Sequence, residues 1–204
     1  MYTFLVAIIR FFVLLICGLD VEGLEHIPQN TGAIVAGNHT TWFDPLILAI
    51  AIKRPIHFMG KAELFEHPIP RWFLSSLHAF PIRRGQADRQ AIRMSQDKVT
   101  QGHLLGMFPE GTRNKTSEAL LPVQGGAALI ALKTGVPIIP VVVSRASLRG
   151  WRKPFKVTIG APVDLGGPKK ASKVEVARGS ETISAQFSSL LSRNNKEYRE
   201  IHPK

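Results

Sequence analysis

A histidine and an aspartate lie five positions apart, His39 and Asp44, between an apolar run and a helix-start signal. On one continuous helix this spacing would place them on different faces. Residues 33–36 are small or β-branched and predict a buried strand, whereas Asp44-Pro45 predicts a helix start. If Asp44 is the N-cap and the helix begins at Pro45, the intervening turn can fold the imidazole back onto the carboxylate.

Such a pair could perform general-base chemistry. Asp44 could accept a helix N–H on one oxygen and an imidazole N–H on the other, which would fix the tautomer of His39 and leave its far nitrogen as a proton acceptor. With no obvious serine or cysteine partner, this predicts that His39 removes the proton of a substrate hydroxyl, which then attacks an acyl carbon. The spacing also arises by chance, so its context decides the interpretation.

A second turn, residues 108–113, reads Phe-Pro-Glu-Gly-Thr-Arg and follows the apolar run 104–107. Open α/β sheets bind ligands at the ends of their strands. Arg113 could bind a phosphate bidentately, and Gly111 would let backbone approach a ligand closely. Glu110 could hold the turn by accepting backbone N–H groups, or pair with Arg113. The alternative is a simple surface turn with an ion pair.

With two further blocks, these turns resemble the glycerophospholipid acyltransferase family, in particular its 1-acyl-sn-glycerol-3-phosphate acyltransferases. The resemblance covers residues 30–145 and rests on Asn38-His39-Thr40-Thr41-Trp42-Phe43-Asp44-Pro45, Phe80-Pro81-Ile82-Arg83-Arg84-Gly85, residues 108–113 and Val136-Pro137-Ile138-Ile139-Pro140-Val141. It implies that His39 and Asp44 are catalytic. It also implies substrate-binding roles for Lys61, Arg84, Glu110, Gly111, Thr112 and Arg113. Arg83 departs from relatives, which often carry an acidic residue there.

The resemblance implies transfer of a fatty acyl group from acyl-CoA or acyl carrier protein to a lysophospholipid. The expected acceptor is 1-acylglycerol-3-phosphate, giving phosphatidic acid, and another lysolipid or glycerol 3-phosphate stays open. Backbone N–H groups near Gly111 are expected to stabilise the oxyanion. No metal or redox cofactor is implied, since the candidate residues lack the usual ligand count for a metal. The chain also lacks a G-x-S-x-G elbow and a phosphate-binding G-x-x-x-x-G-K-[ST] loop.

The formal net charge of +11 predicts attraction to nucleic acid or to an anionic membrane. Residues 4–19 are apolar except for Arg10 and would form a helix of roughly 24 Å, short of a bilayer core of about 30 Å. We therefore expect a membrane-associating helix over residues 1–19, followed by the acyltransferase domain, residues 20–204. A buried core helix is the alternative. The protein is then expected on a membrane, at its cytoplasmic face. A nonenzymatic nucleic-acid or membrane-binding module would leave both turns without purpose.

The remaining pattern predicts an α/β fold with a mainly parallel central sheet flanked by helices. Strands are expected at residues 21–24, 33–36, 56–59, 104–107, 137–143 and 156–160, and helices at 46–53, 88–101, 124–134 and 180–191. The prolines of residues 137–143 favour an irregular or edge strand. Arg84 and Arg113 could converge on one phosphate. Arg89 and Arg93, at helical spacing, more often form a solvated face.

Overall fold

The computed structural model describes residues 1–83, 88–116, 118–145, 154–167 and 170–201. Within them, seven strands form one sheet in the order β1-β7-β6-β2-β5-β3-β4, and all neighbouring strands are parallel except β6 and β7. The predicted α/β class is confirmed. The strands are β1 (Leu19–Glu22), β2 (Ala33–Gly37), β3 (Ile56–Lys61), β4 (Phe80–Ile82), β5 (Leu104–Met107), β6 (Ile138–Arg145) and β7 (Phe155–Ile159).

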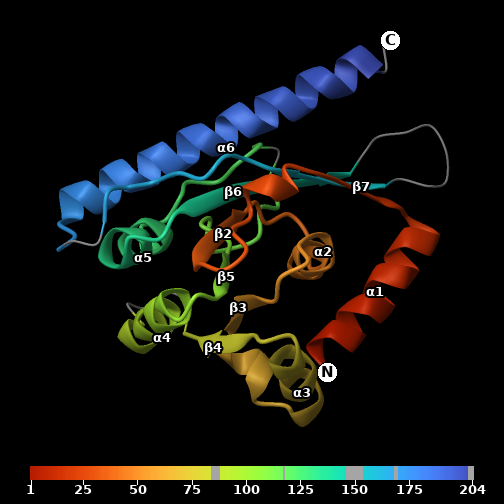
Figure 1. The fold of residues 1–204 in the computed structure, drawn as a ribbon, viewed down its shortest axis with the longest axis horizontal. Coiled ribbons are helices and arrows are strands. Elements are labelled where there is room, and N and C mark those ends of the chain that lie inside the picture. Colours follow the sequence, from red (N-terminus) through yellow and green to blue (C-terminus); the bar gives the residue numbers. More distant parts are fainter. Residues whose placement is uncertain (84–87, 117, 146–153, 168–169, 202–204) are drawn as a thin grey trace.

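The helices cover both faces of this sheet (Figure 1). They are α1 (Tyr2–Ile16), α2 (Asp44–Ala51), α3 (Pro68–Ser76), α4 (Arg89–Thr100), α5 (Gly126–Thr134) and α6 (Lys173–Ile201), with 3₁₀ turns at Leu24–His26 and Ala62–Phe65. In β2, Ala33 and Val35 pack toward α1 and α2, whereas Ile34 and Ala36 pack toward α5 and α6. Burial on both faces explains why the strand reads as a continuous apolar run.

Helix α1 packs against the same core as the sheet. Val6, Ile9 and Val13 contact the cluster that contains α2, and the Arg10 guanidinium donates a hydrogen bond to the Ile50 carbonyl. Arg10 therefore binds the protein's own backbone. The opposite side of α1 is exposed and apolar, with Phe4, Phe11, Phe12 and Leu15. None of the helices in the described ranges has the length and apolar character needed to cross a bilayer.

The expected edge character of residues 137–143 is wrong, because β6 lies between β7 and β2. Its two prolines fit there for a specific reason. Hydrogen bonds to β2 use the carbonyls of Pro137 and Val141, so Pro140 faces the other neighbour. The Pro140 carbonyl accepts the N–H of Gly160 just beyond β7, and its missing N–H removes no bond to β2.

The starts of β1 and α6 also differ from expectation. Strand β1 begins two residues earlier and ends at Glu22; Gly23, with a φ of 80°, then caps the 3₁₀ turn that follows. Helix α6 begins at Lys173 and not at residue 180. A capping box explains the early start, since the Ser172 N–H donates to the Glu175 carboxylate while the Glu175 N–H donates to the Ser172 hydroxyl.

Candidate active site

His39 starts the turn that follows β2, and the preceding residue anchors it. The buried Asn38 side chain continues the ladder between β2 and β6, accepting the Val143 N–H at 2.8 Å and donating to the Val143 carbonyl at 3.1 Å. A side-chain amide thus replaces one backbone step of the sheet. Because both of its hydrogen bonds go to β6, the chain leaves the sheet at a fixed position and His39 follows rigidly.

The His39 imidazole reaches Asp44, as the spacing predicts, with Nδ1 3.1 Å from Oδ2. The same oxygen accepts the N–H groups of Thr40 and Thr41, each at 2.7 Å, and Oδ1 accepts the Thr41 hydroxyl at 2.6 Å. The expected helix N–H bond is wrong, because α2 begins at Asp44 itself and Phe43 is the N-cap. The carboxylate binds the turn before the helix, a local alternative that aspartate side chains favour.

These contacts determine the charge and tautomer of the pair. Burial alone would raise the pKa of Asp44, which is only 1% exposed. The hydrogen bonds from His39, Thr41 and Thr40 together outweigh burial, so the pKa lies below its ordinary value. An ionised Asp44 accepts a hydrogen bond from the N–H at Nδ1, which leaves Nε2 of His39 as the proton acceptor. The ring also stacks on Phe108, with centroids 4.2 Å apart, which limits its rotation.

The second turn holds the backbone of His39 from both sides. The Glu110 carboxylate, 4% exposed, accepts the His39 N–H at 2.7 Å and the Leu121 N–H at 3.0 Å, while the His39 carbonyl accepts the Asn114 N–H at 2.7 Å. Of the two roles expected for Glu110, backbone anchoring is therefore the one observed. Gly111 adopts a φ of 71° and donates its N–H to the Phe108 carbonyl at 2.9 Å. That N–H is engaged within the turn, and the expected oxyanion site at N–H groups near Gly111 stays a prediction.

The predicted cations that the structure describes have different partners. Arg113 lies over the exposed Trp42 ring of the first turn, 4.1 Å from its centroid, so the two turns are in contact. Lys61 ends β3 and pairs with Glu63 at 3.0 Å. Arg84 lies outside the described residues, so the expected convergence of Arg84 and Arg113 stays a prediction, as do the substrate roles of Thr112 and Lys61.

An open cavity of about 870 Å³ begins at His39 and Phe108 and runs between α4 and α5. Of the predicted site residues that the structure describes, His39 and Gly111 line it, while Asp44 lies behind the imidazole. The lining beyond the predicted site residues consists of apolar groups and of polar groups, most of them on α4 or α5. It includes Met59, Ile82, Ala91, Ile92, Met107, Ala127 and Leu129, together with Arg83, Arg89, Arg93, Gln96, Gln124 and Lys133.

Comparisons with known proteins agree on one family. The sequence model of the Acyltransferase family matches residues 18–144. A 1-acyl-sn-glycerol-3-phosphate acyltransferase of Bacillus subtilis is 33% identical over 141 residues, covering 69% of each chain. One of Streptococcus pneumoniae is 32% identical over 184 residues, covering 87% of this chain and 66% of that protein. A lyso-ornithine lipid O-acyltransferase of Pseudomonas aeruginosa is 35% identical over 109 residues, covering 52% of this chain and 41% of that protein.

A solved structure agrees with the sequence comparisons. The crystal structure of the 1-acyl-sn-glycerophosphate acyltransferase PlsC from Thermotoga maritima superposes with a TM-score of 0.68 at 27% sequence identity. The match covers 93% of this chain and 80% of the other. The likeness therefore extends over nearly all of the fold described above.

Proposed function

The chain belongs to the acyltransferase family, and from this premise we propose that it acylates 1-acyl-sn-glycerol-3-phosphate to phosphatidic acid, with His39 as the general base. The acyl group comes from a thioester of coenzyme A or acyl carrier protein. The observation that carries this proposal is the His39–Asp44 pair at 3.1 Å, placed at the start of an open cavity. Family membership makes the chain an O-acyltransferase and disfavours a nucleic-acid module.

The reaction moves one proton from the acceptor hydroxyl to His39 and then from His39 to the leaving thiolate. Nε2 of His39 takes the proton of the acceptor hydroxyl while the hydroxyl oxygen attacks the thioester carbonyl. The imidazolium that results is stabilised by the ionised Asp44 on the opposite side of the ring. The tetrahedral intermediate then expels the thiolate, which recovers the proton from His39. An ester and a free thiol leave, and the histidine returns to its starting state.

Negative charge develops on the carbonyl oxygen, and the first turn of α5 is well placed to stabilise it. Gly126 and Ala127, the first residues of that helix, line the same cavity as His39. The first amides of a helix have no intrahelical acceptor and carry the positive end of the helix dipole. For the acceptor phosphate, Arg113 on the second turn and Arg83 in the cavity lining are described candidates, with Arg84 and Lys61 as predicted from sequence.

We also propose that the protein acts on a membrane surface, at its cytoplasmic face. Trp42 and Phe43, 65% and 58% exposed, extend from the catalytic turn itself. Ile69 and Trp72 on α3 and the outer side of α1 add further exposed apolar groups. Exposed apolar side chains of this size on a basic protein favour contact with anionic lipid. This arrangement would bring the catalytic turn to its lipid acceptor.

The test follows thiol release from acyl-CoA and from acyl carrier protein thioesters, with lysophosphatidate as acceptor and phosphatidic acid identified by mass spectrometry. The wild-type protein should form phosphatidic acid, and His39→Ala should reduce turnover by more than about 10³-fold, the upper part of the range for a general base. Residual turnover within tenfold of wild type would remove His39 from the role of base. Glycerol 3-phosphate and a lyso-ornithine lipid, offered in parallel, identify the acceptor class.

A further inference from the structure

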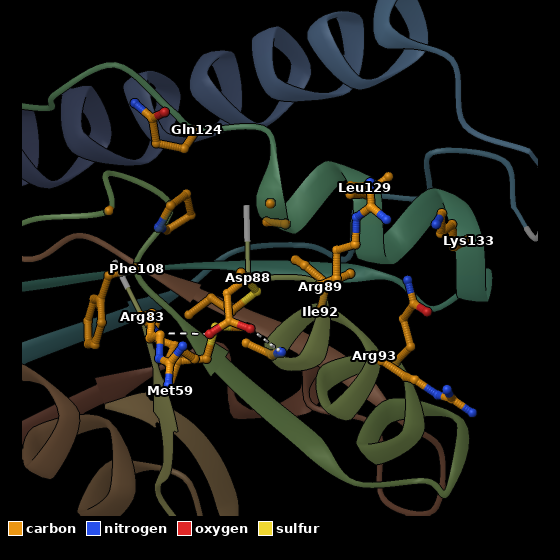
Figure 2. A pocket seen from close by; sticks show the side chains of 18 of the residues that line it. Met59, Arg83, Asp88, Arg89, Ile92, Arg93, Phe108, Gln124, Leu129 and Lys133 are labelled. Atoms are coloured by element: carbon orange, nitrogen blue, oxygen red, sulfur yellow. Dashed lines mark hydrogen bonds between the residues drawn. The ribbon is translucent and has the colours of Figure 1, made fainter. Parts of the chain in front are cut away.

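The cavity that begins at His39 ends in a group of cations. Figure 2 shows Phe108 at one end and Arg93 and Lys133 toward the other, with Arg89 between α4 and α5; in this view the end of the Arg93 side chain is directed away from Lys133. Arg89 and Arg93 are one turn apart on α4, so they lie on the same side of that helix. Lys133 is near the end of α5, about 10 Å along the helix from Gly126 at 1.5 Å per residue. We call Arg89, Arg93 and Lys133 the distal cations.

The distal cations have no visible counterions. Within the described ranges, no carboxylate lies within ion-pairing distance of any of them. The cavity lining holds two carboxylates. Asp88 accepts the backbone N–H groups of Arg83 and Ala91, and Asp97 lies one turn beyond Arg93 on α4 without an ion pair to the distal cations in the described ranges. Gln96, one turn beyond Arg93 and also in the lining, has a buried Nε2 without a hydrogen-bond partner in the described part of the chain. This end of the cavity therefore offers donors and positive charge to a ligand.

Neither the acyl chain nor the acceptor's phosphate fits the distal cations. A fatty acyl chain ends in a methyl group, which gains nothing from unpaired guanidinium and ammonium groups. The acceptor's phosphate is separated from the reacting hydroxyl by only two carbons and one oxygen, so it must lie close to His39. Lys133 is about 10 Å along α5 from Gly126, which lines the catalytic end.

The acyl thioester supplies an anion at the required distance. Its sulfur is joined to a phosphate by a long arm that contains two amides, the phosphopantetheine group that coenzyme A and acyl carrier protein share. We propose that the distal cations bind the phosphate of this arm, while the arm lies between α4 and α5 and delivers the thioester to His39. This inference rests on the proposed function and assigns the donor to this cavity. Gln96 is placed to donate to the phosphate or to an amide carbonyl of the arm.

The experiment compares a donor with and without its phosphate. Acyl-pantetheine, acyl-phosphopantetheine, acyl-CoA and acyl carrier protein with the same acyl chain are offered to wild type, Arg93→Gln, Lys133→Gln and the double variant. Each cation should contribute about tenfold in the KM of phosphorylated donors, as expected for a charge-assisted hydrogen bond at an exposed position. The KM for acyl-pantetheine and for the acceptor should change less than twofold. Arg93→Lys should recover most of the loss.

Arg178→Gln, which removes an exposed cation of α6 outside the cavity lining, is the matched control. It should leave every KM unchanged. Equal losses with acyl-pantetheine and acyl-phosphopantetheine, or losses confined to the acceptor KM, would overturn the proposal. If the substitutions raise the KM of acyl-CoA more than that of acyl-phosphopantetheine, part of the contact is to the nucleotide phosphates of coenzyme A. If they raise the KM of acyl-CoA and of acyl carrier protein equally, the contact is to the phosphate that both donors share.

Calorimetry separates this inference from the proposed function. Phosphopantetheine should bind to the wild-type protein more tightly than pantetheine, and the double variant should abolish the difference. This readout needs no turnover, so a protein that binds phosphopantetheine in this way but transfers no acyl group would refute only the proposed function. Equal affinity for the two ligands in the wild type would refute only the phosphate site.

Discussion

Replacement of Asp44 by asparagine should separate the charge of the carboxylate from its hydrogen bonds. Three donors converge on Oδ2, namely Nδ1 of His39 and the N–H groups of Thr40 and Thr41. An asparagine carbonyl oxygen can take that position and accept all three. Its amide group then faces the Thr41 hydroxyl, which can rotate and accept where it donated before. The turn should therefore keep its shape in Asp44→Asn while the negative charge disappears.

Loss of the charge in Asp44→Asn should destabilise the transition state, in which His39 carries a positive charge. At a separation near that of this pair, two unit charges attract by about 4 kcal/mol at an effective dielectric constant of 20. The pair is shielded from solvent, since the side chains of His39 and Asp44 are 9% and 1% exposed. Loss of that attraction should lower kcat by about 10²–10³-fold. The unfolding free energy should change by less than about 1 kcal/mol.

Asp44→Ala is the matched comparison, because it removes the hydrogen bonds together with the charge. Four donors then lose their acceptor, and we expect the unfolding free energy to fall by about 3–5 kcal/mol, as when one partner of a buried pair is deleted. Since the pKa of wild-type Asp44 lies below 3.8, its carboxylate stays ionised throughout a neutral assay range.

The assays are initial rates of thiol release at saturating donor and acceptor, and urea unfolding of each variant. An Asp44→Asn enzyme within fivefold of the wild-type kcat would refute the electrostatic role of the carboxylate. Destabilisation of Asp44→Asn as large as that of Asp44→Ala would refute our account of the three converging hydrogen bonds.

Three further predictions concern other parts of the chain. Glu110→Ala should lower the unfolding free energy by about 2–4 kcal/mol in urea titrations, because the buried N–H of His39 and the partly buried N–H of Leu121 lose their acceptor; an unchanged urea midpoint would contradict the anchoring role. Burial, assisted by nearby positive charge, lowers the pKa of His57 from 6.5 to about 4, so the unfolded chain binds more protons in that window and stability falls on acidification. After discount for partial exposure, the unfolding free energy of wild type should fall by about 1–2 kcal/mol more than that of His57→Asn between about pH 7 and pH 4.5. An equal fall for both proteins in urea unfolding at the two pH values would disprove this. Phe11→Ser with Leu15→Ser should weaken sedimentation with anionic vesicles, whereas Val174→Ser, which removes an exposed apolar side chain of α6, should not; equal sedimentation of both would argue against lipid contact by α1.

The sequence predicts the parts of the site that depend on local order along the chain. The apolar run before Gly37, the helix after Asp44 and the five-residue spacing are enough to place His39 beside the carboxylate. They do not say which N–H groups share that carboxylate, because a short polar side chain can bind the turn before it or the helix after it. In the structure it binds Thr40 and Thr41.

Contacts between distant segments could not be predicted from the local sequence pattern. Arg113 rests on Trp42, and Lys133 faces the same cavity as Arg93, although each pair is far apart in sequence. Such meetings depend on how α4 and α5 pack on the sheet, which composition and periodicity do not encode. The interior position of β6 was missed for a related reason: the effect of Pro140 depends on which neighbouring strand its side of the backbone faces.

The order of the sheet also has a consequence for how the chain is made. Strand β1 comes directly after α1, yet among the described residues it pairs in the sheet with β7 alone, the last of the seven strands described. During synthesis, β1 must therefore wait until residues 155–159 have left the ribosome before it can pair, and pairing over such a separation is slow. Until then α1 is held only by its contacts with the part of the core already synthesised. The nascent protein can thus bring its apolar helix to a bilayer before its own sheet is closed.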